Sequence, residues 1–335
     1  MPNETMRAVA VTAPGGPEVL EIRDVPLPWP LCGDRVLVRV HAAALNRADV
    51  LQRKGHYPAP PGVVADILGM EFAGEVAAIG DAVQSWKPGQ RVFGITAGGA
   101  QAEYVLVPEN HLVEIPANLD WTAAAAVPEA FITAHDAMFT RAGLHSGESV
   151  LIHAVGSGVG LAAAQLGHAA GALVVGTSRT VNKLSRAREF GLDAAIYTED
   201  DPAEILPRVM KVTNGQGVNV IVDLVGGTYF DTNIKALAPK GRLVLISTSA
   251  GAVAAFSLGA VMSKRLNILG TVLRGRSAEE KATATRLFAE QVVPLLARSV
   301  VRPVIDSVFP LDQVRAAHER MESNDSFGKV VLTLS

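Results

Sequence analysis

Cysteine is nearly absent from this sequence of 335 residues, in which Cys32 is the one thiol. A single cysteine cannot form a disulfide within the chain, and the first residues contain no apolar stretch of the kind found in secretory signals. We therefore expect a cytoplasmic protein. Aromatic residues make up 5% of the chain and charged residues 19%, against 49% hydrophobic residues. This composition excludes a disordered chain and provides enough apolar residues for a large core.

The sequence has no excess of positive charge, because 30 Lys and Arg residues face 33 Asp and Glu residues and the formal net charge is -3. It contains no basic block that would follow a phosphate backbone, which argues against nucleic acid as a partner. Residues 149–178 and 243–263 lack charged side chains, but glycines and polar residues interrupt both stretches. A membrane-spanning helix needs about 20 predominantly apolar residues, so we expect no membrane segment. Buried strands and helices of a parallel sheet explain both stretches better.

The first part of the chain is predicted to be rich in β-structure. Short runs of Val, Ile and Ala are separated by turn signals such as the Pro-Gly-Gly-Pro segment at residues 14–17. This spacing is typical of a small, irregular β-barrel or sandwich. The predicted strands are residues 7–12, 19–25, 35–42, 71–79, 91–95 and 102–107.

Near residue 125 the pattern changes to an alternation of apolar strands and helices. Such alternation indicates a doubly wound parallel sheet, an α/β fold of the Rossmann type. The last strand, at residues 329–334, is expected to return to the first domain. We therefore predict a β-rich domain at residues 1–126, completed by residues 300–335, and a Rossmann domain at residues 127–299. The predicted strands of the Rossmann domain begin near residues 150, 173, 194, 218, 242 and 266, and a helix follows at 278–296.

A glycine-rich segment, Ala-Val-Gly-Ser-Gly-Val-Gly at residues 154–160, follows a predicted strand and opens a predicted helix. Backbone N–H groups and the helix dipole at such a position bind a pyrophosphate. The third glycine of the G-x-G-x-x-G pattern would fall on Leu161, so the alternative is a tight turn that merely requires small residues. The residues predicted to bind a dinucleotide are Gly156, Ser157, Gly158, Val159 and Gly160.

The end of the next strand predicts which dinucleotide binds. About twenty residues after the glycines, an acidic side chain would bind the 2′-hydroxyl of NADH. The sequence has Thr177-Ser178-Arg179 there, and Lys183 follows one helical turn later. Hydroxyl, guanidinium and ammonium groups suit the 2′-phosphate of NADPH. We predict NADPH, held by Ser178, Arg179, Lys183 and Tyr197; the alternative for Arg179 and Lys183 is a solvated helix start.

Several segments are similar to one known family. They are residues 44–57, 68–76 (Leu-Gly-Met-Glu-Phe-Ala-Gly-Glu-Val), 127–134 (Val-Pro-Glu-Ala-Phe-Ile-Thr-Ala), 152–160 and 327–332. The chain resembles the zinc-free quinone oxidoreductase branch of the medium-chain dehydrogenase/reductase superfamily over nearly its whole length. Within that branch it resembles the p53-inducible quinone oxidoreductase subgroup, which also has a serine at the position of Ser157. The resemblance implies a GroES-like β-rich domain beside the Rossmann domain.

Zinc is not expected. Zinc-dependent members of this superfamily have a cysteine ligand where this chain has Asn46 and a histidine where it has Met70. A neutral amide is a weak zinc ligand and a thioether is too soft for this role. A structural site of four cysteines is impossible with Cys32 alone.

The resemblance implies transfer of a hydride or an electron from NADPH to a quinone. An alternative is NADPH-dependent reduction of the C=C bond of enones or 2-alkenals, which the sequence does not separate from the first. A third, non-enzymatic alternative is a redox sensor that binds NADPH. The resemblance places Tyr57 and Asn46 near the acceptor as catalytic residues, although Tyr57 could only pack beside neighbouring prolines and Asn46 could only cap a helix. It also places seven residues near the nicotinamide, each of which could instead serve loop or core packing: Thr133, Ser247, Thr248, Leu273, Arg274, Asn324 and Phe327.

A partner is predicted at the edge of the parallel sheet. The strand predicted at residues 266–272 would leave one row of backbone groups unpaired, which invites pairing with an identical chain. We therefore expect a homodimer with a continuous sheet.

Overall fold

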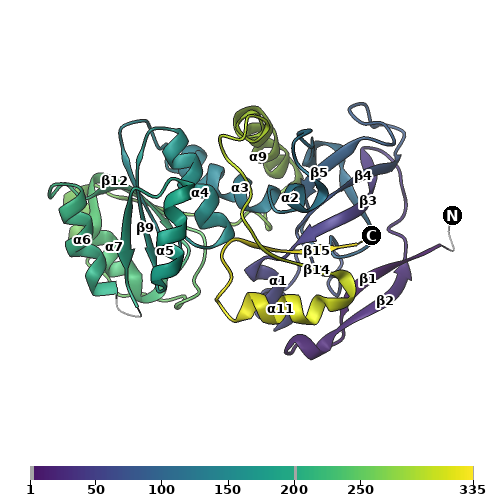
Figure 1. Cartoon of the computed structure of the whole chain (residues 1–335), viewed down its shortest axis with the longest axis horizontal. Coiled ribbons are helices and arrows are strands. Elements are labelled where there is room, and N and C mark those ends of the chain that lie inside the picture. Colours follow the sequence, from purple (N-terminus) through teal and green to yellow (C-terminus); the bar gives the residue numbers. More distant parts are fainter. Residues whose placement is uncertain (1–3, 200–201, 335) are drawn as a thin grey trace. The chain divides into compact units, whose positions relative to one another are not determined.

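The computed structural model describes residues 4–199 and 202–334, which form two compact units (Figure 1). The first unit consists of Met1–Ile132, Leu273–Arg298 and Pro303–Ser335. The second unit consists of Thr133–Val272 and Ser299–Arg302. The boundary near residue 132 lies inside one helix, α3 (Pro128–His135). Among the described residues, no helix combines the length and the apolar character that crossing a membrane requires.

The second unit is built on a parallel sheet of six strands in the order β10-β9-β8-β11-β12-β13. The chain moves outward from β8 in one direction, then returns to β11 and moves outward in the other. This reversal between β8 and β11 defines the doubly wound fold, in which ligands generally bind at the carboxyl ends of the strands. The strands are β8 (Ser149–Ile152), β9 (Leu173–Ser178), β10 (Ala194–Tyr197), β11 (Val218–Asp223), β12 (Leu237–Leu245) and β13 (Asn267–Gly270).

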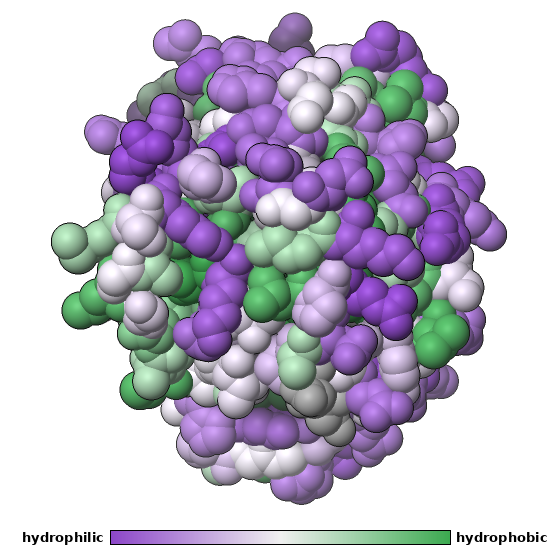
Figure 2. Space-filling model, turned by 90° about the vertical axis from the view of Figure 1, so that its left-hand side faces the viewer, coloured by the Kyte–Doolittle hydropathy of each residue, from purple (hydrophilic) through white to green (hydrophobic). Residues whose placement is uncertain are grey.

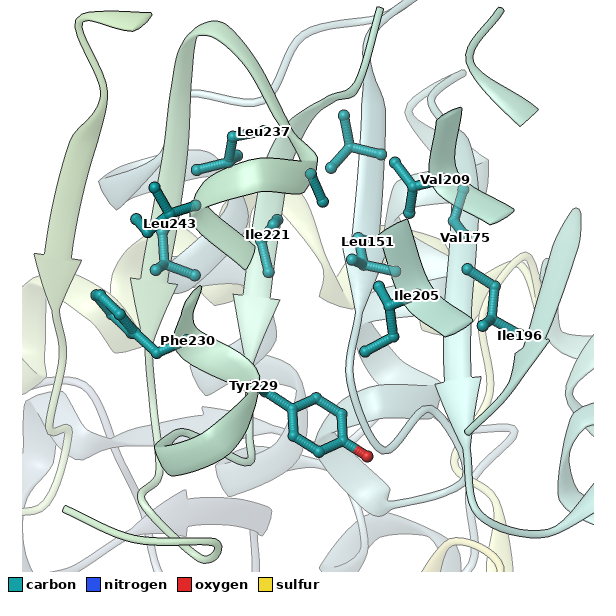
Figure 3. Packing of buried hydrophobic residues seen from close by; sticks show 13 residues of the cluster. Leu151, Val175, Ile196, Ile205, Val209, Ile221, Tyr229, Phe230, Leu237 and Leu243 are labelled. Atoms are coloured by element: carbon teal, nitrogen blue, oxygen red, sulfur yellow. The ribbon is translucent and has the colours of Figure 1, made fainter. Parts of the chain in front are cut away.

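Helices connect these strands and cover their apolar side chains. Figure 3 shows one such layer, in which Leu151, Ile221 and Leu243 from the strands pack with Ile205 and Val209 from α6. All five side chains are fully buried, as expected for strands that lie between helices. The helices of this unit are α4 (Gly158–Ala169), α5 (Val181–Ala187), α6 (Ile205–Val212), α7 (Phe230–Ala236) and α8 (Leu258–Lys264), with a π-helix η3 (Asp136–Arg141) and the 3-10 helices η4 (Arg188–Phe190), η5 (Pro202–Glu204) and η6 (Gly227–Tyr229).

The first unit contains a sheet of seven strands in the order β14-β15-β3-β4-β5-β7, with β6 paired to β3. The long strand β3 has three partners because one of its edges pairs first with β6 and then with β15. The C-terminal strand therefore returns to the first unit, as predicted. The strands are β1 (Thr5–Val11) and β2 (Leu20–Pro26), which form a separate hairpin, and β3 (Arg35–Ala44), β4 (Glu71–Ile79), β5 (Arg91–Ile95), β6 (Tyr104–Pro108), β7 (Leu112–Glu114), β14 (Ile305–Pro310) and β15 (Lys329–Thr333).

The helices of the first unit surround this sheet. One of them, α1, begins just after β3 and Asn46, where a helix capped by Asn46 was one of the alternatives. The region predicted as one helix at residues 278–296 is two helices, because Pro294 has no amide hydrogen to continue the hydrogen bonds of the first helix and lies in the first turn of the second. The helices are α1 (Arg47–Arg53), α2 (Trp121–Ala125), α9 (Ala278–Gln291), α10 (Val293–Ala297) and α11 (Val314–Glu322), with the 3-10 helices η1 (Pro17–Val19), η2 (Glu109–His111) and η7 (Leu311–Gln313).

The predicted domain limits, 1–126 with 300–335 and 127–299, differ from the observed units at α9. Residues 273–298 were assigned to the Rossmann domain by sequence order, but α9 packs on the first unit. Its Phe288 ring lies 5.7 Å from the Phe93 ring, and His111 Nε2 lies 3.1 Å from the carbonyl oxygen of Ala278. The apolar face of α9 therefore decides its place, and the order of elements along the chain does not.

Candidate functional site

The glycine-rich turn joins β8 to α4 as predicted. Ser157 is the N-cap of α4, and its Oγ accepts a hydrogen bond of 3.1 Å from the amide of Gly160. The amides of Gly158 and Val159 lie in the first turn, where no preceding helical carbonyl can accept their hydrogens. Together with the helix dipole, these amides provide a binding site for an anionic phosphate.

Two glycines, Gly160 and Gly176, allow close approach around this turn. A Cβ on Gly160 would lie 2.5 Å from the carbonyl oxygen of Ala154, so only glycine fits where α4 meets the turn. Gly160 thus provides the close packing that the sequence pattern assigns to a third glycine at position 161. A Cβ on Gly176 would lie 2.9 Å from the Val155 side chain, which rests on β9.

The residues predicted to select the cofactor gather around the carboxyl end of β9. Ser178 and Tyr197 are register partners on β9 and β10, and the exposed Arg179 follows Ser178 directly. The stem of Lys183 lies over the glycine turn, since a Cβ on Gly156 would be 3.0 Å from Lys183 Cδ. Tyr197 donates its hydroxyl hydrogen to Glu199 over 2.9 Å. The structure therefore brings Lys183 against the turn and places Ser178, Arg179 and Tyr197 together at the carboxyl ends of β9 and β10.

Ser247 and Thr248 lie in the loop after β12, next to the loop that follows β11. The amide of Ser247 lies 3.4 Å from the carbonyl oxygen of Asp223, and a Cβ on Gly226 would be 3.1 Å from the Ser247 carbonyl oxygen. Thr133, the remaining predicted residue of the second unit, is buried on α3. The glycine cradle, the free first-turn amides and the basic and hydroxyl groups at β9 fit the phosphates of a dinucleotide.

In the first unit, Asn46 is held by charged neighbours. Its Nδ2 donates to Glu71 Oε1 over 2.9 Å, and its Oδ1 accepts from Lys329 Nζ over 2.7 Å. Lys329 also forms an ion pair of 2.6 Å with Glu71. Asn46 is also the N-cap of α1, and its amide donates to Asp49 Oδ2 over 2.7 Å as part of a capping box. Both polar atoms of the Asn46 side chain are therefore engaged inside the unit.

Glu129, which the sequence analysis did not select, belongs to the same cluster of carboxyl groups. It lies at the start of α3, and its amide donates to Glu71 Oε2 over 2.9 Å. Burial, and then the negative charge of Glu71, raise the pKa of Glu129 to about 8. Burial also raises the pKa of Asp49 to about 6. The sequence signal that could have identified Glu129 is its position after Pro128 in an otherwise apolar segment, where a carboxyl group is expected to be buried.

Tyr57 lies under the guanidinium of Arg274. The Arg274 Cζ is 5.1 Å from the centre of the Tyr57 ring, its Nε donates to the Ala97 carbonyl oxygen over 2.7 Å, and its Nη2 donates to Gln52 Oε1 over 2.6 Å. Burial raises the pKa of Tyr57, and the charge of Arg274 opposes this change. The phenol keeps its proton at neutral pH and can donate a hydrogen bond. The predicted contact of Arg274 with the cofactor stays a prediction.

The other predicted residues of the first unit are divided between core and surface. Leu273 and Phe327 are 7% and 1% exposed, which favours the core-packing alternative for both. The amide of Phe327 donates to Asp306 Oδ1 over 2.8 Å. Asn324 is exposed, with a φ of 61° in the left-handed region, and its Oδ1 accepts from Arg47 Nη2 over 2.7 Å.

Comparison with known proteins agrees with both halves of this description. Residues 158–290 match the family described as zinc-binding dehydrogenase, and residues 33–117 match the alcohol dehydrogenase GroES-like domain. The quinone oxidoreductase of Homo sapiens is 31% identical over 333 residues, which cover 98% of each chain. The chain belongs to the quinone oxidoreductases of the medium-chain dehydrogenase/reductase superfamily. It is therefore an oxidoreductase, and the predicted α/β fold with a GroES-like domain is confirmed.

Two solved structures are similar to this chain over nearly its whole length. The quinone oxidoreductase of Pseudomonas syringae pv. Tomato DC3000 has a TM-score of 0.87 at 29% identity and covers 99% of this chain and 100% of its own. A mycobacterial protein complexed with NADPH has a TM-score of 0.86 at 28% identity, covering 98% of this chain and 100% of its own. Assignment to the p53-inducible subgroup stays a prediction.

A prediction concerns the protonation of Glu129. Its pKa is about 8 in the folded protein and near 4.5 in the unfolded chain, so the folded protein holds an extra proton between these values. The contribution of this proton to the free energy of unfolding is fully present below about pH 4.5 and is lost as the pH rises through about 8. The loss is at most about 1.4 kcal/mol per pH unit. We expect wild type to lose stability between pH 6.5 and 8 and Glu129→Gln to lose less, as measured by urea unfolding.

The exposed Glu114, changed to Gln, is the control and should leave the pH dependence of wild type unaltered. The interval above pH 6.5 avoids most of the titration of Asp49. Parallel curves for wild type and Glu129→Gln would mean that Glu129 is ionised in the folded protein.

Proposed function

We propose that the protein is an NADPH-dependent, zinc-independent quinone reductase. The observation that carries the proposal is the group of basic and hydroxyl side chains at the end of β9, beside the glycine turn. Ser178 ends the strand and Arg179 follows it, Lys183 lies over Gly156, and no acidic residue follows the strand directly. The mycobacterial structure in complex with NADPH supports the cofactor, and the names of the relatives support the quinone.

The second unit would hold the cofactor through groups at the glycine turn and at the end of β9. The first-turn amides of Gly158 and Val159 would bind the pyrophosphate, and Arg179 and Lys183 would bind the 2′-phosphate. NADPH supplies the hydride when it is bound. Glycine at position 160 keeps α4 close to the turn, so that these amides stay at the end of β8.

Zinc independence is supported by a fixed positive charge. The Lys329 ammonium lies 2.7 Å from Asn46 Oδ1 and 2.6 Å from Glu71 Oε1, within a buried cluster. It neutralises Glu71 and occupies the one ligand atom that Asn46 could offer. A divalent cation at that atom would be repelled by the ammonium. Met70 is buried and carries only a soft thioether.

The first unit offers Tyr57 to the acceptor. Two-electron reduction of a quinone adds a hydride and a proton, and negative charge develops on an acceptor oxygen before the proton arrives. A neutral phenol can stabilise that oxygen by donating a hydrogen bond and can pass on its proton, which solvent then replaces. Arg274 orients the ring and favours transient loss of the proton because its positive charge lies 5.1 Å from the ring centre.

The test of function measures the loss of NADPH absorbance with an ortho-quinone, a para-quinone and a 2-alkenal. We expect rapid oxidation with the quinones, and Tyr57→Phe should lower kcat by about tenfold or more with an unchanged KM for NADPH. Tyr104→Phe, at a partly buried tyrosine on β6, is the control. Added cytochrome c distinguishes one-electron from two-electron reduction.

Two results would replace the proposal. Oxidation of NADPH by the alkenal alone would establish a C=C reductase, and NADPH binding without oxidation by any acceptor would favour the redox sensor. Unaltered turnover in Tyr57→Phe would leave the quinone activity in place and remove the catalytic role of Tyr57.

Cofactor choice is tested separately. Arg179→Ala should raise the Kd for NADPH by about tenfold, because a charged hydrogen bond to the 2′-phosphate is worth about 1.5–3 kcal/mol. The Kd for NADH should change less than about twofold. Arg186→Ala, at an exposed arginine of α5, should alter neither Kd. Equal effects of Arg179→Ala on both cofactors would refute a role in binding the 2′-phosphate.

We also propose a homodimer through β13, the edge of the parallel sheet. Ile268 on β13 is 37% exposed, and Val272, just after the strand, is 53% exposed; Leu258 and Met262 of the neighbouring α8 are 69% and 76% exposed. Figure 2 looks onto the end of the second unit, where hydrophobic side chains protrude along the left side. An apolar edge with unpaired backbone groups fits a second copy, whose β13 would extend the sheet.

Light scattering at micromolar protein should therefore give the mass of a dimer. Ile268→Lys should shift the protein toward the monomer, since it places a charge in the middle of the apolar edge. The control is Val308→Lys on β14, which is 48% exposed and lies at the edge of the other sheet. A monomeric mass for wild type would refute the dimer, and equal effects of both lysines would refute this edge as the interface.

A further inference from the structure

A chain of buried polar side chains connects the carboxyl ends of three strands in the second unit. Thr177 is on β9, His153 follows β8, Asp223 ends β11, and Asn233 is on α7. Their exposed fractions are 1% for Thr177 and 0% for the other three. The sequence analysis assigned no role to these residues, and the proposed mechanism does not use them. Buried polar groups need hydrogen-bond partners, and each of these has one within the chain.

The direction of the hydrogen bonds follows from the asparagine. Asn233 Nδ2 donates to Asp223 Oδ2 over 3.0 Å, so its Oδ1 is the acceptor that faces His153 Nε2 at 2.7 Å. The imidazole must carry its proton on Nε2. Burial lowers the pKa of His153 and keeps the ring neutral, so Nδ1 accepts from Thr177 Oγ1 over 3.0 Å. Each polar group then has one defined role from Thr177 to Asp223.

The far end of the chain fixes a loop. Asp223 Oδ1 accepts from the amides of Val225 and Gly226, both over 2.8 Å. Gly226 has a φ of 67° and packs against the carbonyl of Ser247, in the loop predicted to approach the nicotinamide. The carboxylate thus holds the loops after β11 and β12.

The near end fixes the strand that precedes the predicted phosphate-binding residues. Thr177 is followed directly by Ser178 and Arg179, and its carbonyl oxygen accepts from the amide of Val155 in the glycine turn over 3.0 Å. Its side chain and backbone therefore bind the end of β9 to the end of β8. A displacement of Thr177 would move Ser178 and Arg179 relative to the turn.

We propose that the hydrogen-bonded chain Thr177–His153–Asn233–Asp223 positions the cofactor-binding loops, and that Thr177 is the specificity-determining position for the 2′-phosphate. The inference rests on the proposed use of NADPH. Thr177 is a positioning residue, because it acts through Ser178 and Arg179. The Thr177 hydroxyl holds the end of β9 in place because it donates to Nδ1 of the neutral His153 ring. Without it, the buried Nδ1 would lose its hydrogen-bond partner at a cost in free energy, and the end of β9 would shift.

The experiment compares Thr177→Val with Thr177→Ser in the full chain. The probes are 2′,5′-ADP and 5′-AMP, which differ by the 2′-phosphate, and their binding is measured by calorimetry. We expect Thr177→Val to weaken 2′,5′-ADP by about tenfold and 5′-AMP by less than about twofold, whereas Thr177→Ser keeps both within about twofold of wild type. Thr177→Ala removes the same hydroxyl without pressing a methyl group on His153, and it replaces Thr177→Val if that variant does not fold.

The matched control is Thr213→Val, which also removes a hydrogen-bonded hydroxyl of the second unit. Thr213 Oγ1 donates to the Val209 carbonyl oxygen and accepts from the amide of Gly217, at the opposite end of β11. It should lower the melting temperature and leave the ratio of the two affinities unchanged. If wild type prefers 2′,5′-ADP and Thr177→Val has the same ratio of the two affinities, this inference is overturned and the cofactor assignment stands. Wild type without that preference would overturn both.

Discussion

A carboxylate buried at the end of β11 constrains the arrangement of the second unit. Asp223 has no exposed surface, and an unpaired charge in such a place costs several kcal/mol. The loop after the strand must therefore turn back to present the amides of Val225 and Gly226, and α7 must place Asn233 beside the strand end. Gly226 adopts φ 67° and ψ -153°, a combination that is essentially restricted to glycine. Loop, helix and histidine are thus coupled to one charged group.

The first unit satisfies a similar constraint with an ion pair. Glu71 is fully buried on β4, and Lys329 reaches it from β15, the last strand of the chain. The same ammonium donates to the carbonyl oxygen of Leu45 at the start of the turn into α1. The return of the C-terminal strand therefore brings the charge that allows Glu71 to be buried, in addition to apolar side chains such as Val331.

The fold was largely predictable because both of its repeating patterns are local. Alternating strands and helices identified the doubly wound sheet, and glycines before a helix identified the turn at residues 154–160. The place of α9 was not predictable, since the contact between Phe288 and Phe93 joins positions far apart in the sequence. The short strand β7 was also missed, because three residues give no periodic signal.

The candidate site was predictable as a set of residues but not as a network. Asn46 was selected, yet its partners Glu71 and Lys329 come from two other strands. Gly160, expected to serve only as part of the phosphate loop, also provides the close packing of a third glycine. No sequence pattern states which polar groups a buried residue such as His153 will meet, because that depends on how three strand ends converge.

The two units differ in how much polar chemistry they leave available. At the glycine turn, the first-turn amides of α4 have no helical carbonyl to bind, so an anionic cofactor can be recognised through backbone donors. In the first unit, Asn46 and Arg274 are bound to neighbours, whereas the Tyr57 hydroxyl has no hydrogen-bond partner among the described residues. A single phenol gives limited stabilisation to a developing oxyanion. The proposed acceptors, quinones and conjugated carbonyls, suit such a site because they are more electrophilic than simple ketones before they bind.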